Sequence, residues 1–171
     1  MKRNLFIMAL IVLLTVVFGS GLVLADENKV GFAVSTLSNP FFVNMRDAGV
    51  EKAEELGLDL ITLDAQDDVS KQVSQIQDLI VRDVDVLIVN PVDSDAISIV
   101  IQEANRANIP VITVTRPANN GEVKQHFDVD NKECGSMVAK KLVEDLNEEG
   151  NIAVLEGLPG AVSTQDRQKG F

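Results

Sequence analysis

The feature that most constrains this chain is a regular alternation of short apolar runs with longer segments that carry apolar residues at helical spacing. The run 30–34 has the length of a strand, and the segment 41–56 after it repeats apolar side chains every three or four residues before Gly57. The expected strands are 30–34, 58–63, 84–89, 110–114, 124–129 and 151–155; the expected helices are 41–56, 69–81, 94–107 and 131–146.

The expected strands are apolar almost throughout, rather than alternately apolar and polar. Such strands occur where helices cover both faces of a parallel sheet. Because crossover connections between parallel strands are right-handed, the pattern predicts a doubly wound α/β sheet.

The first 25 residues have the layout of a secretory signal peptide. Lys2 and Arg3 precede an apolar stretch at 5–18, and Ala25 ends a short segment of small and apolar residues. An uncleaved membrane anchor is the alternative, since 5–25 is almost long enough to span a bilayer. We expect cleavage, because glycines interrupt the apolar stretch near its end, and we therefore expect the protein to be exported to the periplasm or the outer face of the cell membrane.

The charge and the cysteine count exclude several classes of protein. The formal net charge of −11 disfavours nucleic acid and anionic lipid as partners. Cys134 is the only cysteine, so an intrachain disulfide is impossible and a hydrophobic core must hold the fold.

Ligands of open parallel sheets bind beyond the carboxyl ends of the strands. The loops that follow the expected strands there are 35–42, 64–67, 90–94, 115–117 and 130–131, and four of these five contain Asn or Asp. Amide, carboxylate and guanidinium groups together offer donors and acceptors to a polyhydroxylated ligand.

Each candidate residue also has a purely structural interpretation. Asn39 with Pro40 is a common helix start, and Asn90 before Pro91 is a common strand end. Arg116 fits a solvated loop charge. Phe41 and Phe42 fit the core, and Phe42 is the better placed of the two to point inward. The functional interpretation is favoured because all of these residues are expected at one edge of the sheet.

Signatures of an enzyme are absent from the sequence. The loop after the first expected strand holds no glycine, so it cannot be a dinucleotide fingerprint, and the glycines at 157–160 lack the Gly-Lys-Ser/Thr ending of a phosphate loop. His126 is the only histidine and has no paired ligand or base in the sequence. We expect a binding protein without catalytic residues, cofactor or metal.

Several motifs in order along the chain carry a resemblance. STLSNPFF, DAQDDVSKQVSQIQDLI, LIVNPVDSDAI, ANIPVITVTRPA, VDN and GLPGAVSTQDRQKGF together resemble the D-ribose-binding proteins of bacterial ABC sugar transport, over residues 29–171. The resemblance implies a type I periplasmic binding fold in which two lobes close on a sugar. It also implies docking of the closed form on an ABC permease, and in some cases on a chemoreceptor.

The resemblance also implies a set of sugar-binding residues. They are an amide that bonds hydroxyl groups, an aromatic pair of which one ring stacks on the sugar, an amide at the pocket floor and two arginines: Asn39, Phe41, Phe42, Asn90, Arg116 and Arg167. Thr115 stands where the family has an aspartate that takes two hydroxyls. The expected ligand is therefore ribose, another pentose, a sugar derivative or a polyol.

The resemblance implies a division of the chain after the signal peptide into a sugar-binding lobe, 26–129, and the beginning of a second lobe, 130–171. Members of the family continue for roughly another lobe, so we expect a truncated product or an incomplete sequence. Two alternatives to a transport component remain: the sugar-sensing lobe of a signalling or regulatory protein, and an inactive truncated product.

Overall fold

A computed structural model describes residues 28–171, and the expected signal peptide lies outside these residues. In chain order the elements are β1 (Lys29–Val34), α2 (Pro40–Leu56), β2 (Asp59–Asp64), α3 (Val69–Val81), β3 (Val86–Val89), α4 (Ser98–Arg106), β4 (Val111–Val114), β5 (Gln125–Phe127), α5 (Asn131–Asp145) and α6 (Val162–Gly170). We call residues 28–127 the sheet unit. We call α5, α6 and the segment that connects them the helical pair.

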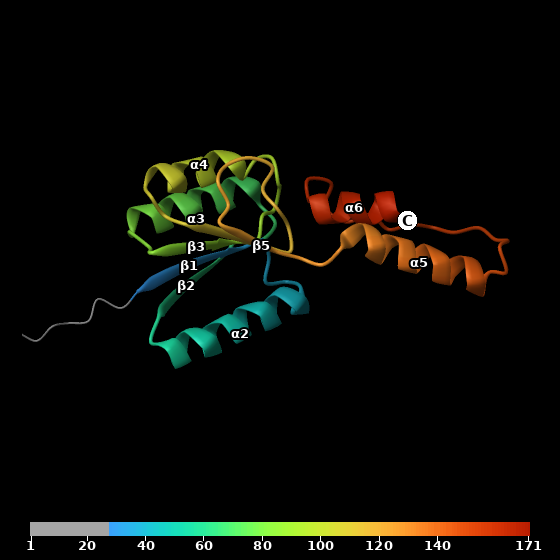
Figure 1. Cartoon of the computed structure of the whole chain (residues 1–171), viewed down its shortest axis with the longest axis horizontal. Coiled ribbons are helices and arrows are strands. Elements are labelled where there is room, and N and C mark those ends of the chain that lie inside the picture. Colours follow the sequence, from blue (N-terminus) through green and yellow to red (C-terminus); the bar gives the residue numbers. More distant parts are fainter. Residues whose placement is uncertain (1–27) are drawn as a thin grey trace, which may run out of the picture.

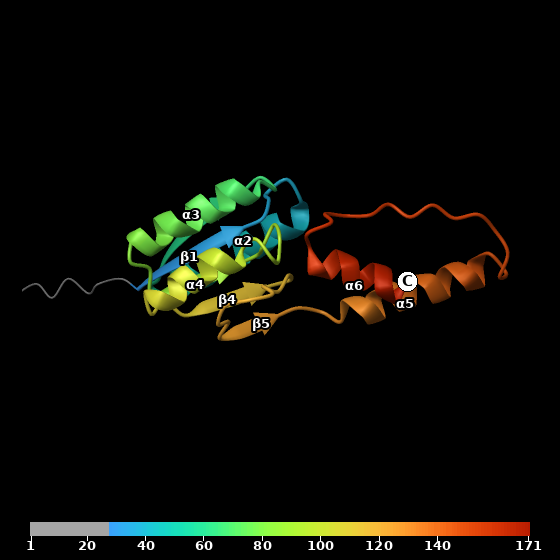
Figure 2. The same cartoon turned by 90° about the horizontal axis from the view of Figure 1, so that it is seen from above.

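The five strands form one sheet of order β2-β1-β3-β4-β5, and all neighbours are parallel. Helices α3 and α4 cover one face and α2 lies on the other (Figures 1 and 2). The main core lies under α3 and α4, where Ile76, Leu79, Leu87 and Ile101 are buried. The predicted doubly wound α/β fold is confirmed.

Capping residues explain where the helices begin. Asn39 and Asp68 precede α2 and α3, and each accepts a hydrogen bond from a backbone N–H of the first turn. Asp130 does the same for α5. These side chains satisfy N–H groups that have no partner within the helix.

The helix expected at 94–107 begins later, at Ser98, and residues 94–97 form a turn. Asp93 Oδ1 accepts hydrogen bonds from the N–H groups of Asp95 and Ala96, at 2.9 and 2.8 Å. Ser94 N–H donates instead to the carbonyl of Gly160, at 3.0 Å. A contact from a distant part of the chain therefore helps to hold the turn that precedes the helix.

The helical pair lies beyond the end of β5, with α5 and α6 side by side (Figures 1 and 2). Gly135 allows this close approach, because a Cβ there would overlap with the backbone of Arg167. The strand expected at 151–155 is wrong: these residues form no strand, and Leu155 is 98% exposed. Among the described residues no strand lies beside this segment to pair with it.

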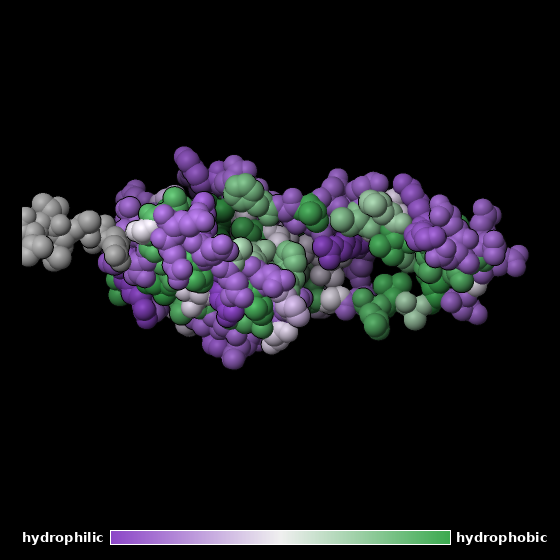
Figure 3. Space-filling view, turned by 90° about the horizontal axis from the view of Figure 1, so that it is seen from below, coloured by the Kyte–Doolittle hydropathy of each residue, from purple (hydrophilic) through white to green (hydrophobic). Residues whose placement is uncertain are grey.

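Hydrophobic residues reach the surface of both parts of the molecule (Figure 3). A groove of about 350 Å³ runs beside α2 along the sheet and is lined by residues that include Met45, Ile88 and Val114. None of the helices within residues 28–171 has the length and apolarity needed to span a membrane.

Candidate functional site

The carboxyl ends of β1, β3 and β4 are adjacent in the sheet, so their loops meet at one edge. Asn90, directly after the central strand β3, is completely buried there. Its Oδ1 accepts from Ser35 N–H at 3.3 Å, and its Nδ2 donates to the Val114 carbonyl at 2.9 Å and to Thr115 Oγ1. One side chain thus joins the loops after β1 and β4.

Gln72 on α3 fixes the loop after β3 through two hydrogen bonds to the backbone of that loop. Its Nε2 donates to the Asn90 carbonyl at 2.8 Å, and its Oε1 accepts from Val92 N–H at 2.8 Å. Gln72 is itself buried, so these bonds replace the water that its amide would otherwise bind. The floor of the site is therefore built from satisfied amide groups.

The two phenylalanines at the start of α2 differ in exposure. Phe42 is 6% exposed and packs with Phe32 and Val34, as predicted from its position, whereas Phe41 is 56% exposed. The two rings meet edge to face, with centroids 5.3 Å apart. Phe41 therefore offers an exposed aromatic face to a ligand bound at the carboxyl-end edge of the sheet.

Asn39 begins α2, and its Oδ1 accepts from Phe41 N–H at 2.9 Å. The structural interpretation of this residue as a helix cap is confirmed. The hydrogen bonds within residues 28–171 leave its exposed Nδ2 without an acceptor. One residue can therefore cap the helix and still donate to a ligand.

Thr115 adopts a left-handed backbone conformation, with φ of +59°. This conformation is costly for a β-branched residue. Two backbone bonds of 2.7 Å hold it, from Thr115 N–H to the Phe127 carbonyl and from Arg116 N–H to the Val114 carbonyl. The strained turn lifts Arg116 out of the strand direction at the edge.

Arg116 lies between the loops rather than in solvent. Its Nη1 donates to the Pro91 carbonyl at 2.9 Å, and its guanidinium carbon lies 5.4 Å from the centre of the Phe42 ring. Burial lowers the pKa of Arg116, while nearby Asp67 raises that pKa and nearby Arg167 lowers it further. An arginine starts so far above neutrality that the group remains a cation.

Arg167 comes from α6, and its Nε donates to Asn131 Oδ1 at 2.8 Å. Its positive charge lowers the pKa of Arg116, although 50 residues separate the two in the sequence. The helical pair thus contributes a second cation at the edge of the sheet unit.

The structure brings Asn90, Thr115, Arg116 and Phe42 into direct contact, with Arg167 near Arg116, while Asn39 and Phe41 lie exposed at the start of α2. Sequence reasoning placed Asn131 in a candidate loop without giving it a role, and it did not single out Gln72. Asn131 had a visible signal, because it follows the last strand of the sheet and a capping aspartate. Gln72 had only its place on the buried side of a helix.

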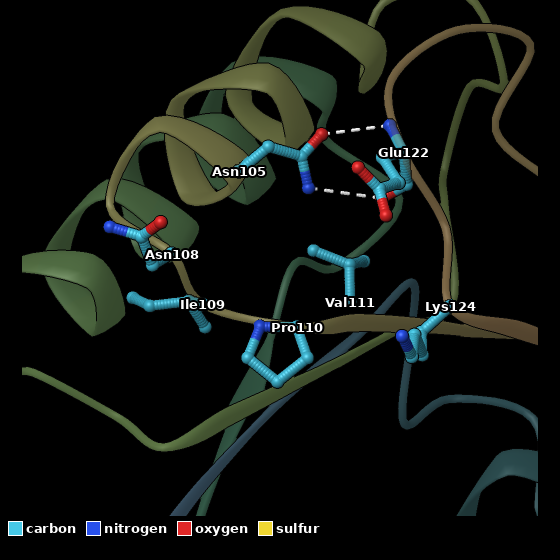
Figure 4. Close-up of a pocket in the computed structure, with 7 residues that line it drawn as sticks. All are labelled: Asn105, Asn108, Ile109, Pro110, Val111, Glu122 and Lys124. Carbon is cyan, nitrogen blue, oxygen red and sulfur yellow. Dashed lines mark hydrogen bonds between the residues drawn. The ribbon is translucent and has the colours of Figure 1, made fainter.

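A polar pocket of about 240 Å³ lies at the opposite, amino end of β4 (Figure 4). There Asn105 accepts from Glu122 N–H at 2.7 Å and donates to the Glu122 carbonyl at 3.0 Å. Both bonds fasten the loop after β4 to α4, so this amide serves the fold. Residues 28–171 contain no group of three or more side chains suited to hold a metal ion.

Comparisons with known proteins identify the family and the fold of this chain. The family model of the periplasmic binding protein domain matches residues 30–171. The chain is 42% identical, over 85% of its length and 48% of the relative's, to the ribose import binding protein RbsB of Bacillus subtilis (strain 168). It is 34% identical, over 79% of its length and 41% of the relative's, to the D-xylose-binding periplasmic protein of Escherichia coli (strain K12).

A solved structure, the Caulobacter myo-inositol binding protein bound to myo-inositol, superposes with a TM-score of 0.80 at 33% identity. That match covers 88% of this chain and 51% of the other. The chain spans about half the length of the curated relatives it matches. The shared parallel sheet and the family match over nearly all described residues lead to one conclusion: this chain belongs to the periplasmic binding protein domain family.

Proposed function

We propose that this chain is the substrate-binding component of an ABC-type sugar importer, and that it binds ribose or a related pentose, sugar derivative or polyol without chemical change. The observation that carries the proposal is that the Arg116 guanidinium lies over the Phe42 ring beside one sheet edge, and that the exposed Phe41 ring packs on Phe42. Curated relatives named for ribose and xylose binding support the sugar class.

The chemistry of these groups suits a sugar ring. The apolar C–H faces of a sugar pack on an aromatic plane, which Phe41 offers. Guanidinium groups donate to several hydroxyl oxygens at once, and Asn39 Nδ2 adds another donor. Asn90 shapes the floor, because both hydrogens of its Nδ2 are already used within the protein.

Thr115 restricts the range of ligands that we expect to bind tightly. Its hydroxyl accepts from Asn90 Nδ2, so it offers a weak neutral acceptor at the centre of the edge where a carboxylate would offer a strong one. We therefore expect weak binding of a ligand that requires two neighbouring hydroxyls to be held at this point.

Within this proposal residues 26–129 are the first sugar-binding lobe and 130–171 begin the second. The chain passes between them at 128–130 and returns near Gly160, whose carbonyl accepts from Ser94 N–H. A Cβ at position 160 would overlap with the Asp93 carboxylate, so glycine permits this return contact. The sugar would lie between the lobes, where closure removes water.

The family consists of periplasmic binding proteins, which makes the periplasm the natural location. We propose that residues 1–25 direct export and that an ABC permease or a chemoreceptor is the membrane partner. A structure with 27% identity is the fructose binding periplasmic domain of a hybrid two component system. The comparisons as a whole favour transport over a regulatory role or an inactive product.

Calorimetric titration of the purified chain with D-ribose, D-xylose, D-allose and myo-inositol tests the proposal. We expect at least one of them to bind. Phe41→Ala and Arg116→Ala should each weaken that binding by about tenfold or more, the factor for one hydrogen bond to a charged donor or a strong stacking contact.

The matched controls are Val81→Ala and Arg82→Ala, which remove an exposed apolar side chain and a cation at the end of α3. Both should bind sugar as the parent does. Absence of binding to the whole panel, or equal binding by parent and both site variants, contradicts the proposed function.

A further inference from the structure

Asn131, at the start of α5, joins the segment between β5 and α5 to Arg167 of α6 through three hydrogen bonds. Its Oδ1 accepts from Arg167 Nε at 2.8 Å. Its Nδ2 donates to Asp128 Oδ2 at 2.6 Å and to the Val129 carbonyl at 3.3 Å. The residue is 6% exposed, so water cannot readily replace any of these partners.

The partners of Asn131 permit only one orientation of its amide. With Nδ2 toward Asp128 and Val129, each contact joins a donor to an acceptor. Rotation of the amide by 180° would place its oxygen against a carboxylate and a carbonyl, and its NH₂ against the Nε–H of Arg167. Each of the three hydrogen bonds would then become a repulsive contact.

Asp128 supplies the stronger of the two acceptors that set this orientation. Its Oδ1 accepts from Val129 N–H at 2.8 Å, which holds the carboxylate in place, while Oδ2 faces Asn131. The nearest cationic candidate is His126, with Nε2 3.7 Å from Oδ2, and the Nδ1 of that ring lies 2.8 Å from Thr113 Oγ1. The shorter contact of Asp128 Oδ2 is therefore with the Asn131 amide.

We propose that Asp128 is a positioning residue for Arg167 and acts through Asn131. The carboxylate orients the amide, and the amide oxygen holds the guanidinium at the edge of the sheet unit. Asp128 lies in the segment between β5 and α5, so the same contacts fasten that connecting segment to the helical pair. This inference rests on the proposed function only where it says that a held Arg167 improves sugar binding.

The position of Arg167 can be followed directly by NMR through the exchange of its Nε–H with solvent, with Arg167→Lys identifying the signal. In Asp128→Ala the amide of Asn131 loses the stronger of the two acceptors that orient it. We expect the Arg167 Nε–H to exchange about tenfold faster, the factor for losing one hydrogen bond of a charged donor.

Two further variants separate orientation from general damage. Asp128→Asn keeps an oxygen that accepts from Asn131, so protection of the Arg167 Nε–H should return to within about twofold of the parent value. In the double variant Asp128→Ala with Asn131→Asp, both oxygens of residue 131 are acceptors and orientation no longer matters. Protection should be restored there as well.

Asp145→Ala is the matched control, since it removes a carboxylate from the far end of α5, where Lys141 is its partner. Circular dichroism shows whether each variant is folded, and the double variant tests the inference if Asp128→Ala alone unfolds. Unchanged exchange in Asp128→Ala overturns the inference. Equal loss of protection in Asp128→Asn and Asp128→Ala also overturns it, because charge rather than orientation would then be responsible.

Calorimetry with D-ribose on the same variants separates this inference from the proposed function. We expect weaker binding by Asp128→Ala and recovery in Asp128→Asn. If Arg167 loses protection while D-ribose binding stays the same, the role of Asp128 stands and the assignment of Arg167 as a sugar contact fails.

Discussion

The sheet unit and the helical pair use similar sequences in different ways. The apolar run of β3 is part of a five-stranded sheet, and Leu87 and Val89 are completely buried. The apolar run 151–155 forms no strand, and Ile152, Val154 and Leu155 are each at least half exposed. The difference shows that an apolar run becomes a strand only where a neighbouring strand accepts its backbone hydrogen bonds.

The same contrast appears in the helices. Helix α3 packs on the sheet and buries Ile76 and Leu79, whereas α5 leaves Met137 and Val138 about 60% exposed. Among the buried hydrophobic residues of the described chain, only Ala161 follows residue 127. Stability should therefore reside in the sheet unit.

The largest effect should come from truncating the core. Ile76→Ala should lower the free energy of unfolding by about 2–5 kcal/mol, because it leaves a cavity between α3 and the sheet. Ile152→Ala, the same change in the helical pair, should alter the free energy of unfolding by no more than about 0.5 kcal/mol. The chain has no Trp or Tyr, so denaturant unfolding followed by circular dichroism is the suitable measurement. Equal losses in the two variants would refute the contrast.

A change at the sheet edge should alter binding next. Thr115→Asp places a carboxylate beside the Asn90 amide and Arg116, and should tighten D-ribose binding by about 1.5–3 kcal/mol. Aspartate also tolerates the left-handed backbone better than threonine does.

Thr115→Asn is the control for that change, since it has nearly the same shape as aspartate but no charge. It should gain much less affinity in calorimetry than Thr115→Asp. An aspartate variant that binds D-ribose no more tightly than the parent would show that residue 115 does not face the ligand.

Loss of the buried amide at the edge should weaken the sheet unit. Asn90→Ala leaves the buried N–H of Ser35 and the carbonyl of Val114 without their partner, at a cost of about 1–3 kcal/mol in unfolding free energy. Asn44→Ala, at an exposed position of α2, should be neutral within about 0.5 kcal/mol. A thermally unchanged Asn90→Ala protein would mean that the loops do not depend on this residue.

The smallest effects should come from exposed ion pairs, which occur in both parts of the molecule. Asp78 pairs with Arg82 on α3 and Lys141 with Asp145 on α5, each four residues apart. Loss of either pair should cost about 0.2–0.5 kcal/mol, with the α3 pair slightly stronger because its acid lies toward the helix amino end. Thermal unfolding of Asp78→Ala and Asp145→Ala at low and high salt checks both values. A loss above 1 kcal/mol for either would indicate contacts beyond the pair.

Much of the sheet unit follows from local patterns. The central strands are mostly apolar, and Asn39, Asp68 and Asp130 mark helix starts by capping chemistry that needs no distant partner. The turn before α4 is also held by a contact that no local pattern shows, because Gly160 accepts the Ser94 N–H from 66 residues away.

For the site, the sequence indicated the edge, the two phenylalanines and Arg116. It did not indicate that Asn90 joins two loops, that Gln72 supports them, or that Asn131 holds Arg167. Each of these bonds connects residues that are distant in the sequence, and an amide has no spacing pattern that marks its partner. The sugar-binding roles of the site residues remain predictions.

By itself the sequence determined the alternation of strands and helices, and with it the parallel sheet and the edge where polar loops gather, because periodicity and capping are local properties. Only the tertiary structure decided that the run 151–155 stays out of a strand, that Asn90 joins the loops after β1 and β4, and that Asn131 accepts a hydrogen bond from Arg167. Those outcomes depend on which distant groups are present to accept a hydrogen bond or cover a side chain, and residues far apart in the chain supply them.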